Sequence, residues 1–142
     1  MGRVGNERTG CSNLVLKVAA GQVLEQGTMV ALNTDGYAVP AAKAADLVIA
    51  GVAQSYANNG LGEDGAEVVS VRRGAFVMNA DATIKENDLL KTAYMADATT
   101  LTLTAEGSSP VGTILEVAAD GVTVLIGTLG MDVISKPVTP AT

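Results

Sequence analysis

The sequence predicts an all-β fold, and three features of its composition lead to that prediction. Of the 142 residues, 48% are hydrophobic but only 3% are aromatic, so a core must be built from small aliphatic side chains. Many of these are β-branched, and such side chains suit the pleated surface of a sheet better than a helix. The chain also holds 16 Gly, several of them directly after Asn or Asp, and such pairs are typical of tight turns. We therefore expect a compact all-β domain with at most one or two short helices.

The chain divides into three parts. Residues 1–13 are polar and rich in Gly, and we expect them to form a flexible N-terminal arm. Residues 14–127 are dense in short apolar runs and should form one β-rich domain. Residues 128–142 contain Pro137 and Pro140, which oppose regular structure, and should form a C-terminal tail.

Within the central part, the sequence suggests two related halves, about 14–74 and 75–127. The order of segments is the same in each half, and the weakly similar pairs are 23–32 with 83–92, 49–54 with 110–116, and 67–74 with 121–127. Each half offers a sheet with one apolar face, so we expect the two halves to bury these faces against each other.

Apolar runs between turn residues predict the individual strands. They are expected at residues 14–18, 28–32, 37–39, 47–53, 67–72, 75–78, 89–94, 100–104, 111–117 and 122–126. The turn Asn33–Gly36 should join the second and third strands into a hairpin. Residues 41–46, after Pro40, leave one helical turn open as an alternative to a loop.

Charge and cysteine content limit the partners and the compartment. The chain carries 9 basic and 15 acidic residues, and its largest basic cluster is the pair Arg72-Arg73. Duplex nucleic acid is bound by neutralising many phosphates, so nucleic acid is not an expected partner. The basic side chains, Lys17 included, are expected to be solvated; if functional, they would meet an acidic protein. The lone Cys11 fits a reducing compartment, and the sequence shows neither a signal peptide nor an apolar run of the ~20 residues that a membrane span needs.

The residues that enzymes commonly use are missing or isolated. The absence of His excludes Ser-His-Asp and Cys-His catalysis, and Cys11 alone does not make a zinc site. Carboxylates such as Asp35 and Asp120 fall at expected turns, where Asp stabilises the backbone. We therefore expect a protein that is not an enzyme and that has no cofactor and no metal.

One segment matches the dinucleotide-binding pattern G-x-G-x-x-G, at Gly60–Gly65. That pattern binds pyrophosphate only where a strand precedes it and a helix follows it. Here a strand is expected to follow, and Glu63 and Asp64 would repel phosphate. We interpret the segment as a loop.

A family resemblance is carried by four runs: AGQVLEQGTMVALNTDGYAVPA, IAGVAQ, GAEVVSVRRGAFVMNADATIKENDLLKT and SSPVGTILEVAADGVTVLIG. Over about residues 19–127 this pattern resembles the capsid decoration (cement) proteins related to the lambda head-stabilising protein. The shared pattern is a strand such as Gly27–Leu32 leading to Asp-Gly, then Gly51-Val52-Ala53, then a Val-rich strand ending in Gly. The chain departs from the simplest members by its loop at 57–66 and its C-terminal tail.

The resemblance implies a compact, β-barrel or β-tulip-like domain that forms a homotrimer. It implies binding to the major capsid protein on the outside of an icosahedral phage head, at threefold and quasi-threefold positions. There the protein would stabilise the shell against DNA pressure. It would be found in the host cytoplasm during assembly and afterwards on the exterior of the virion.

The candidate capsid-binding residues lie in the arm and at the start of the first strand. An arm with few apolar residues can gain affinity by adding as a strand to a sheet edge of another protein. The candidates are Arg3, Val4, Arg8, Leu14, Val15 and Leu16. The alternative is an arm that is frayed and contacts nothing.

Two other function classes stay open from sequence. A barrel-sandwich carrier domain needs a Lys at a hairpin tip, and the tip Asn33–Gly36 has none. A glycan-binding β-domain of a phage tail usually grips sugar rings with aromatic side chains, which are scarce here.

Overall fold

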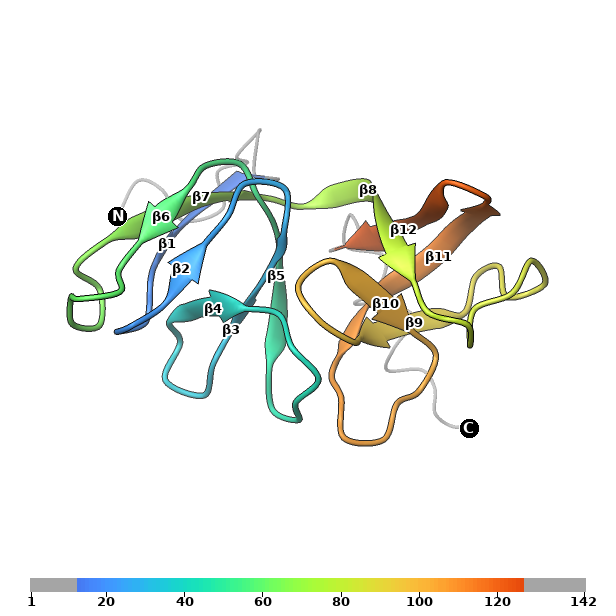
Figure 1. Cartoon of the computed structure of the whole chain (residues 1–142), viewed down its shortest axis with the longest axis horizontal. Helices are drawn as coiled ribbons and strands as arrows, with labels where there is room; N and C mark the ends of the chain where they lie inside the picture. Colours follow the sequence, from blue (N-terminus) through green and yellow to red (C-terminus); the bar gives the residue numbers. More distant parts are fainter. Residues whose placement is uncertain (1–12, 127–142) are drawn as a thin grey trace, which may run out of the picture.

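The computed structural model describes residues 13–126, and within this range the chain forms strands and no helix. The predicted all-β fold class is confirmed. The strands are β1 (Asn13–Lys17), β2 (Val23–Leu24), β3 (Met29–Leu32), β4 (Ala38–Pro40), β5 (Val48–Ala53), β6 (Ala57–Asn58), β7 (Val68–Arg72), β8 (Gly74–Ala80), β9 (Thr92–Met95), β10 (Thr100–Thr102), β11 (Pro110–Ala118) and β12 (Gly121–Ile126). Figure 1 shows that they make two lobes, one from β1–β7 and one from β8–β12, joined where β7 runs into β8.

The first lobe is a five-stranded sheet with the order β1-β7-β5-β3-β4, and a short ribbon of β2 and β6 lies beside it. The pairings within the sheet are antiparallel, and one parallel bridge, Val18 to Ala38, links its two ends. The second lobe is a closed barrel with the order β10-β8-β12-β11-β9, in which β10 and β8 pair in parallel to close the ring.

The two lobes repeat one strand order. Starting at β8, the barrel runs β8-β12-β11-β9-β10, which corresponds strand by strand to β1-β7-β5-β3-β4. Two of the three segment pairs that the sequence suggested, 49–54 with 110–116 and 67–74 with 121–127, fall in equivalent strands, β5 with β11 and β7 with β12. The third pair, 23–32 with 83–92, is out of register, because Met29 corresponds to Thr92.

The repeat extends to the register of the pairings among these five strands of each lobe. The equivalent residue pairs are Leu14–Val71 and Phe76–Val124, Ala53–Val71 and Ile114–Val124, Val30–Gly51 and Ala93–Gly112, Leu32–Ala38 and Met95–Leu101, and the closing pairs Val18–Ala38 and Ala80–Leu101. The turn that precedes β3 in the first lobe recurs before the equivalent strand β9 in the second lobe. Gly27 and Leu90 both have positive φ, and their N–H groups donate to Ala53 and Ile114, which are equivalent residues.

Glycine is required at one position of this repeat. Gly51 and Gly112 lie beside register shifts in the β3–β5 and β9–β11 pairings. A Cβ atom on either would run into backbone, at the Arg72 carbonyl oxygen for Gly51 and at the Leu125 carbonyl oxygen for Gly112. Both glycines therefore permit a close approach of the neighbouring strand that any side chain would block.

The core explains why the two lobes stay together. One cluster fills the first lobe between its sheet and the β2–β6 ribbon, with Val30 and Val71 at its centre. A second cluster joins the interior of the barrel to Met29, Ala31 and Val52 on the opposite face of the first lobe's sheet. The sheet around β3 is thus buried on both faces, on one side by its own lobe and on the other by the barrel.

Hydrogen bonds accompany this apolar contact between the lobes. The Met29 N–H donates to the Ala98 carbonyl at 2.7 Å. The Ser109 hydroxyl donates to the Ala44 carbonyl at 2.7 Å and accepts the Leu47 N–H at 3.1 Å. These bonds also hold residues 41–47 as an irregular segment, in which Asp46 has a φ of 68°, so the helical alternative at 41–46 is wrong.

Three further strand predictions need correction. β1 begins at Asn13, so this residue belongs to the sheet and not to the arm. The strand expected at 89–94 begins only at Thr92, because Leu90 adopts a left-handed conformation with a φ of 67°. The ribbon of β2 and β6 was not predicted, since two-residue strands carry no periodic signal.

Candidate interaction surface

The first strand lies at an edge of the first lobe's sheet. β1 pairs with β7 on one side, and Val15 stands opposite Ser70. The backbone of Ser70 points the other way, towards β5, because its C=O accepts the Gln54 N–H and its N–H donates to the Ser55 hydroxyl. In an antiparallel pair, residues that face each other in this manner both point away from the shared ladder. The N–H and C=O of Val15 are therefore directed to the open edge, as are those of Asn13 by alternation, whereas at Lys17 the bridge from Val18 to Ala38 brings β4 against β1.

The structure separates the candidate residues into three groups. Val15 is 70% exposed, on the outer face of the sheet. Leu14 and Leu16 are half-buried on the inner face, and Leu16 packs against the core of the first lobe. Arg3, Val4 and Arg8 lie outside the described residues. Of the three candidates within residues 13–126, Val15 is the one whose side chain is placed for contact with a partner.

The outer face of the β1–β7 pair combines apolar and basic side chains. Val68 is 54% exposed beside Lys17, and Arg72 is exposed at the far end of β7. Arg73 differs from its neighbour, because its guanidinium donates to the carbonyls of Ala50 at 2.9 Å and Ile49 at 3.4 Å. Arg73 thus stabilises the irregular part of β5, a role that the sequence did not indicate.

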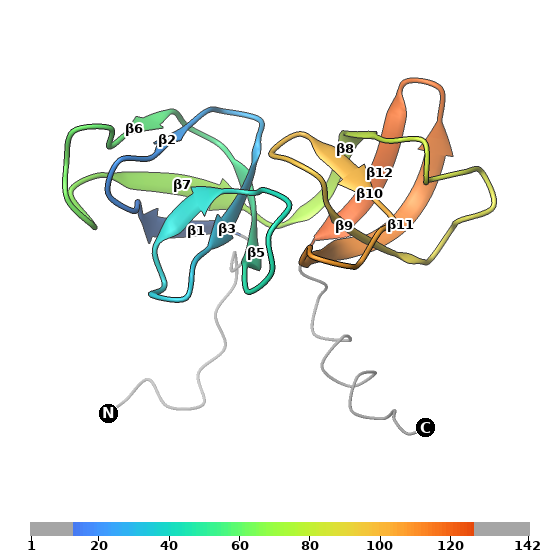
Figure 2. The same cartoon turned by 60° about the horizontal axis from the view of Figure 1, so that its bottom comes forward.

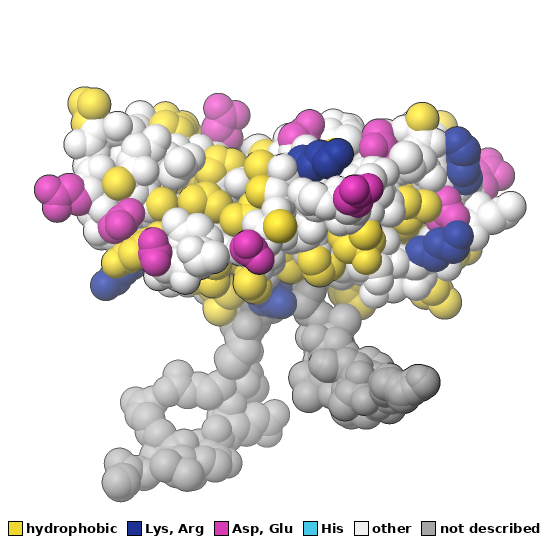
Figure 3. Space-filling view, turned by 90° about the horizontal axis from the view of Figure 1, so that it is seen from below, with side chains coloured by type: hydrophobic (Ala, Val, Ile, Leu, Met, Phe, Trp, Pro, Cys, Tyr) yellow, Lys and Arg dark blue, Asp and Glu magenta, His cyan; other side chains and the backbone are white. Residues whose placement is uncertain are grey.

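The points where the chain enters and leaves the described fold lie close together. Asn13 pairs with Arg72 and Ile126 pairs with Gly74, so both points flank the crossover from β7 to β8. Figure 2 shows both on the same side of the molecule, at its centre. Figure 3 looks at a neighbouring side, the one below the view of Figure 1, where hydrophobic side chains form a band across the middle with carboxylates around it. The first and last described residues, Asn13 and Ile126, therefore lie on one face.

No protein-family model, curated protein or solved structure matches this chain.

The glycine-rich segment Gly60–Gly65 is followed by strand β7 and not by a helix, as expected. Residues 57–66, which we call the plug, fold over one end of the first lobe and are held by Asn59. This side chain is 1% exposed, and its amide donates to the carbonyls of Val18 and Ala19 at 3.1 Å and of Glu63 at 2.8 Å. Gly62 is required, since a Cβ there would collide with the Asn59 Oδ1. Sequence reasoning missed Asn59, whose only signal was its place before a glycine-rich turn.

Replacing Asn59 by Ala should lower the free energy of unfolding by about 2–3 kcal/mol, because three carbonyls lose a donor. Asn59→Asp should be worse at pH 7, where it places a carboxylate against those carbonyl oxygens, and should improve as acid protonates it. Urea unfolding at pH 7 and pH 5 measures both effects. Asn58→Ala, on the exposed neighbour, is the control and should change stability little; equal losses for the two alanine variants would contradict the anchoring role of Asn59.

Three carboxylates at turns have lowered pKa values. The Thr99 N–H donates to Asp97 at 2.9 Å and lowers its pKa. Bonds from the Lys91 ammonium and the Lys85 N–H lower the pKa of Asp88. Partial burial raises the pKa of Asp81, but bonds from Thr83 and Thr102 outweigh it. A general acid needs the opposite, a raised pKa, so these side chains stabilise turns in their charged form.

Acid should destabilise the fold through these carboxylates. A group with a lowered pKa adds stability above its ordinary value, 3.8 for Asp97, and that stability is lost as pH falls through the folded-state pKa. The free energy of unfolding should therefore drop from pH 5 to pH 3. Asp97→Asn keeps an acceptor for Thr99 but removes the charge, so this variant should lose less over the same interval. Urea unfolding at both pH values provides the comparison, and equal losses in the two proteins would be against this role of Asp97.

The hairpin tip that a carrier domain would use for its Lys has none and is folded on itself. The tip Asn33–Gly36 is a closed turn in which the Asn33 Oδ1 accepts the N–H groups of Asp35 and Tyr37, both at 3.0 Å. Within residues 13–126, no three His, Cys, Asp or Glu side chains gather as metal ligands would. In the same range, no helix is long and apolar enough to cross a bilayer.

Proposed function

We propose that this protein is a capsid decoration protein that binds the outside of an icosahedral phage head. Its partner would be the major capsid protein, and homotrimers would occupy threefold and quasi-threefold positions and stabilise the shell. The sequence resemblance over about residues 19–127 supports this proposal. The structural observation that carries it is that Asn13 and Ile126, the first and last described residues, lie on one face, beside the open edge of β1.

This arrangement supplies two means of attachment on one side of the molecule. The open edge of β1 offers the backbone groups of Asn13 and Val15 to an extended segment of the shell, and Val15 adds an apolar contact. Pairing of that kind gains affinity from main-chain hydrogen bonds. The arm, with Arg3, Val4 and Arg8, starts from the same edge and would add contacts to the shell.

Trimerisation would convert weak contacts into firm attachment. When three arms and three edges belong to one particle, the second and third binding events are intramolecular, and the effective concentration replaces the bulk concentration. Such binding suits a shell that offers the same surface at every threefold position.

The composition of purified virions tests the proposal. We expect this protein in a fixed ratio to the major capsid protein, and we expect mild denaturant to remove it without opening the head. If virions assembled in cells that make this protein do not contain it, the proposed function is excluded.

A further inference from the structure

Comparison of the two lobes shows a difference at one end. The stretch Lys17–Gln22 of the first lobe is covered by the plug, whereas the equivalent stretch of the second lobe is open. The Asn59 N–H donates to Gln22, the Asn59 carbonyl accepts the Gly21 N–H, and the Gly65 N–H donates to Val18, all at 2.8–2.9 Å. The chain thus closes this end with its own backbone.

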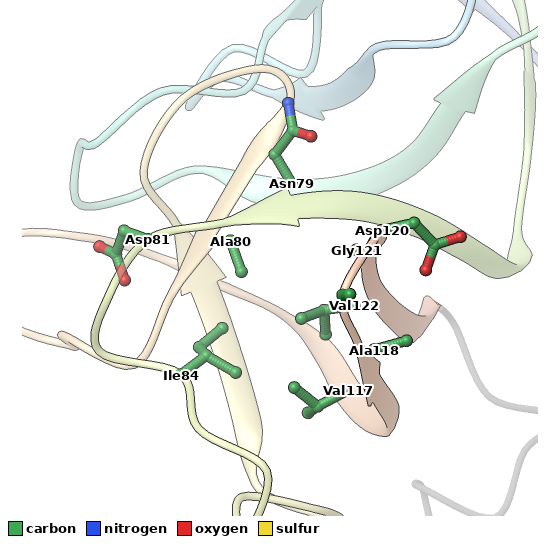
Figure 4. Close-up of a pocket in the computed structure, with 10 residues that line it drawn as sticks. Asn79, Ala80, Asp81, Ile84, Val117, Ala118, Asp120, Gly121 and Val122 are labelled. Carbon is green, nitrogen blue, oxygen red and sulfur yellow. The ribbon is translucent and has the colours of Figure 1, made fainter.

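The equivalent stretch of the second lobe is Asn79–Ile84, since Val18 corresponds to Ala80 and the bond from Gln22 to Ala19 recurs from Ile84 to Asp81. This stretch lines an open pocket of about 420 Å³, whose other wall is residues 117–122 of the β11–β12 hairpin. In Figure 4, Ile84, Val117 and Val122 face the pocket, and Asp81 and Asp120 lie at opposite sides.

The pocket exists because one connection is short. Residues 54–67 join β5 to β7 and include the plug, whereas Ala119 and Asp120 alone join β11 to β12. The second lobe therefore has no counterpart of the plug, nor of the β2–β6 ribbon that the plug makes with residues 23–24. In the first lobe, the Asn59 side chain donates to the carbonyls of Val18 and Ala19. The equivalent carbonyls of the second lobe belong to Ala80 and Asp81, and among the described residues no side chain donates to either of them.

The charges beneath the two ends differ. In the first lobe, Gly65 of the plug lies against the Lys17 side chain, and Asp64 accepts the Ala20 N–H at 2.8 Å. In the second lobe, Asn79 replaces Lys17, and Asp81 accepts hydrogen bonds from Thr83, so Asp120 is the carboxylate at the pocket that binds no neighbour among the described residues. Next to Asp120, a basic group therefore fits better than an acidic one.

We propose that the pocket lined by Asn79–Ile84 and residues 117–122 binds a short extended segment of a partner protein, one that carries an Asn or Gln side chain close to a Lys or Arg. The segment takes the place that the plug holds in the first lobe: its amide donates to the Ala80 and Asp81 carbonyls, and its cationic group lies beside Asp120 at the rim. This inference does not depend on capsid binding.

A designed peptide tests the site. The probe is residues 56–66 with Glu63→Lys and Asp64→Lys, added to the isotope-labelled full chain and followed by NMR. We expect shifts at residues 79–84 and 117–122. The peptide of native sequence should bind more weakly, by about threefold or more for lost and unfavourable charge pairs. The Lys-containing peptide with Asn59→Ala should also bind more weakly.

Two protein variants locate the binding. Val117 is half-buried and its side chain faces the pocket in Figure 4, so Val117→Phe should fill the pocket and abolish the shifts while leaving the fold intact. Asp120→Lys should reverse the preference, so that the native acidic peptide binds more tightly than the Lys-containing one. No shifts at millimolar peptide, shifts confined to the first lobe, or unchanged binding in both variants would overturn the proposal.

Discussion

Deletion of residues 2–12 should lower the affinity for undecorated heads by about tenfold or more, which is ~1.4 kcal/mol. The melting temperature should hardly change, because β1 begins at Asn13 and its pairing with β7 needs only residues 13–17. Ordering about ten residues costs roughly 10–20 kcal/mol of backbone entropy, so the arm can bind firmly only where a sheet edge compensates that cost. Co-sedimentation with heads lacking decoration protein measures the affinity, and calorimetry measures the melting temperature.

A point variant separates the arm from the edge strand. Val15→Asp should weaken head binding, since Val15 lies on the open edge and is 70% exposed. Val77→Asp is a matched control at the equivalent position of the second lobe, where the side chain is 59% exposed. If the truncated protein decorates heads as tightly as the full chain, the arm is only frayed; if Val15→Asp and Val77→Asp behave alike, β1 is not the contact.

Gly51→Ala and Gly112→Ala should be among the most destabilising single-methyl additions in the chain, each by about 2–4 kcal/mol. Both added Cβ atoms meet the backbone of the next strand, which cannot rotate away as a side chain can. Because the two glycines are equivalent in the repeat, the two losses in free energy of unfolding should be of similar size. The loss for Gly51→Ala should be the larger one, since Gly51 also has a φ of 155°. Urea unfolding of both variants beside the wild type measures the losses.

Gly27→Ala provides the control for backbone conformation alone. Gly27 has a φ of 88°, and a Cβ there would have no neighbour within 4 Å. Its loss should be near the 1–2 kcal/mol that a left-handed conformation costs, roughly. If Gly112→Ala lowers the free energy of unfolding no more than Gly27→Ala does, the close approach of β11 and β12 is not the reason for glycine at position 112.

Much of the fold could be predicted because most strands are long enough to show a pattern. β7 and β12 alternate between buried and exposed positions, and the hairpin at Asn33–Gly36 follows from its turn residues. The same alternation could have shown that Leu14 and Leu16 face inward when Val15 faces outward. The start of β9 could not be predicted, since nothing in the pair Leu89-Leu90 signals the left-handed turn.

The remaining features depend on contacts between distant residues. Asn59 is recognisable as an anchor only when Val18 and Ala19 are placed beside it, 41 and 40 residues away in sequence. The pocket of the second lobe likewise becomes visible only by comparison with the first. What the two halves share is the strand order, the pairing register and the glycine of the close approach, and these survive although the similarity of their sequences is weak.

The central proposal is tested most directly by imaging undecorated heads mixed with the purified protein, using cryo-electron microscopy. We predict added trimeric density at threefold and quasi-threefold positions, with the open edge of β1 and the crossover from β7 to β8 turned towards the shell. Heads that gain no density at saturating protein would contradict the proposed function, and density with the β7–β8 crossover facing outward would contradict the proposed binding face.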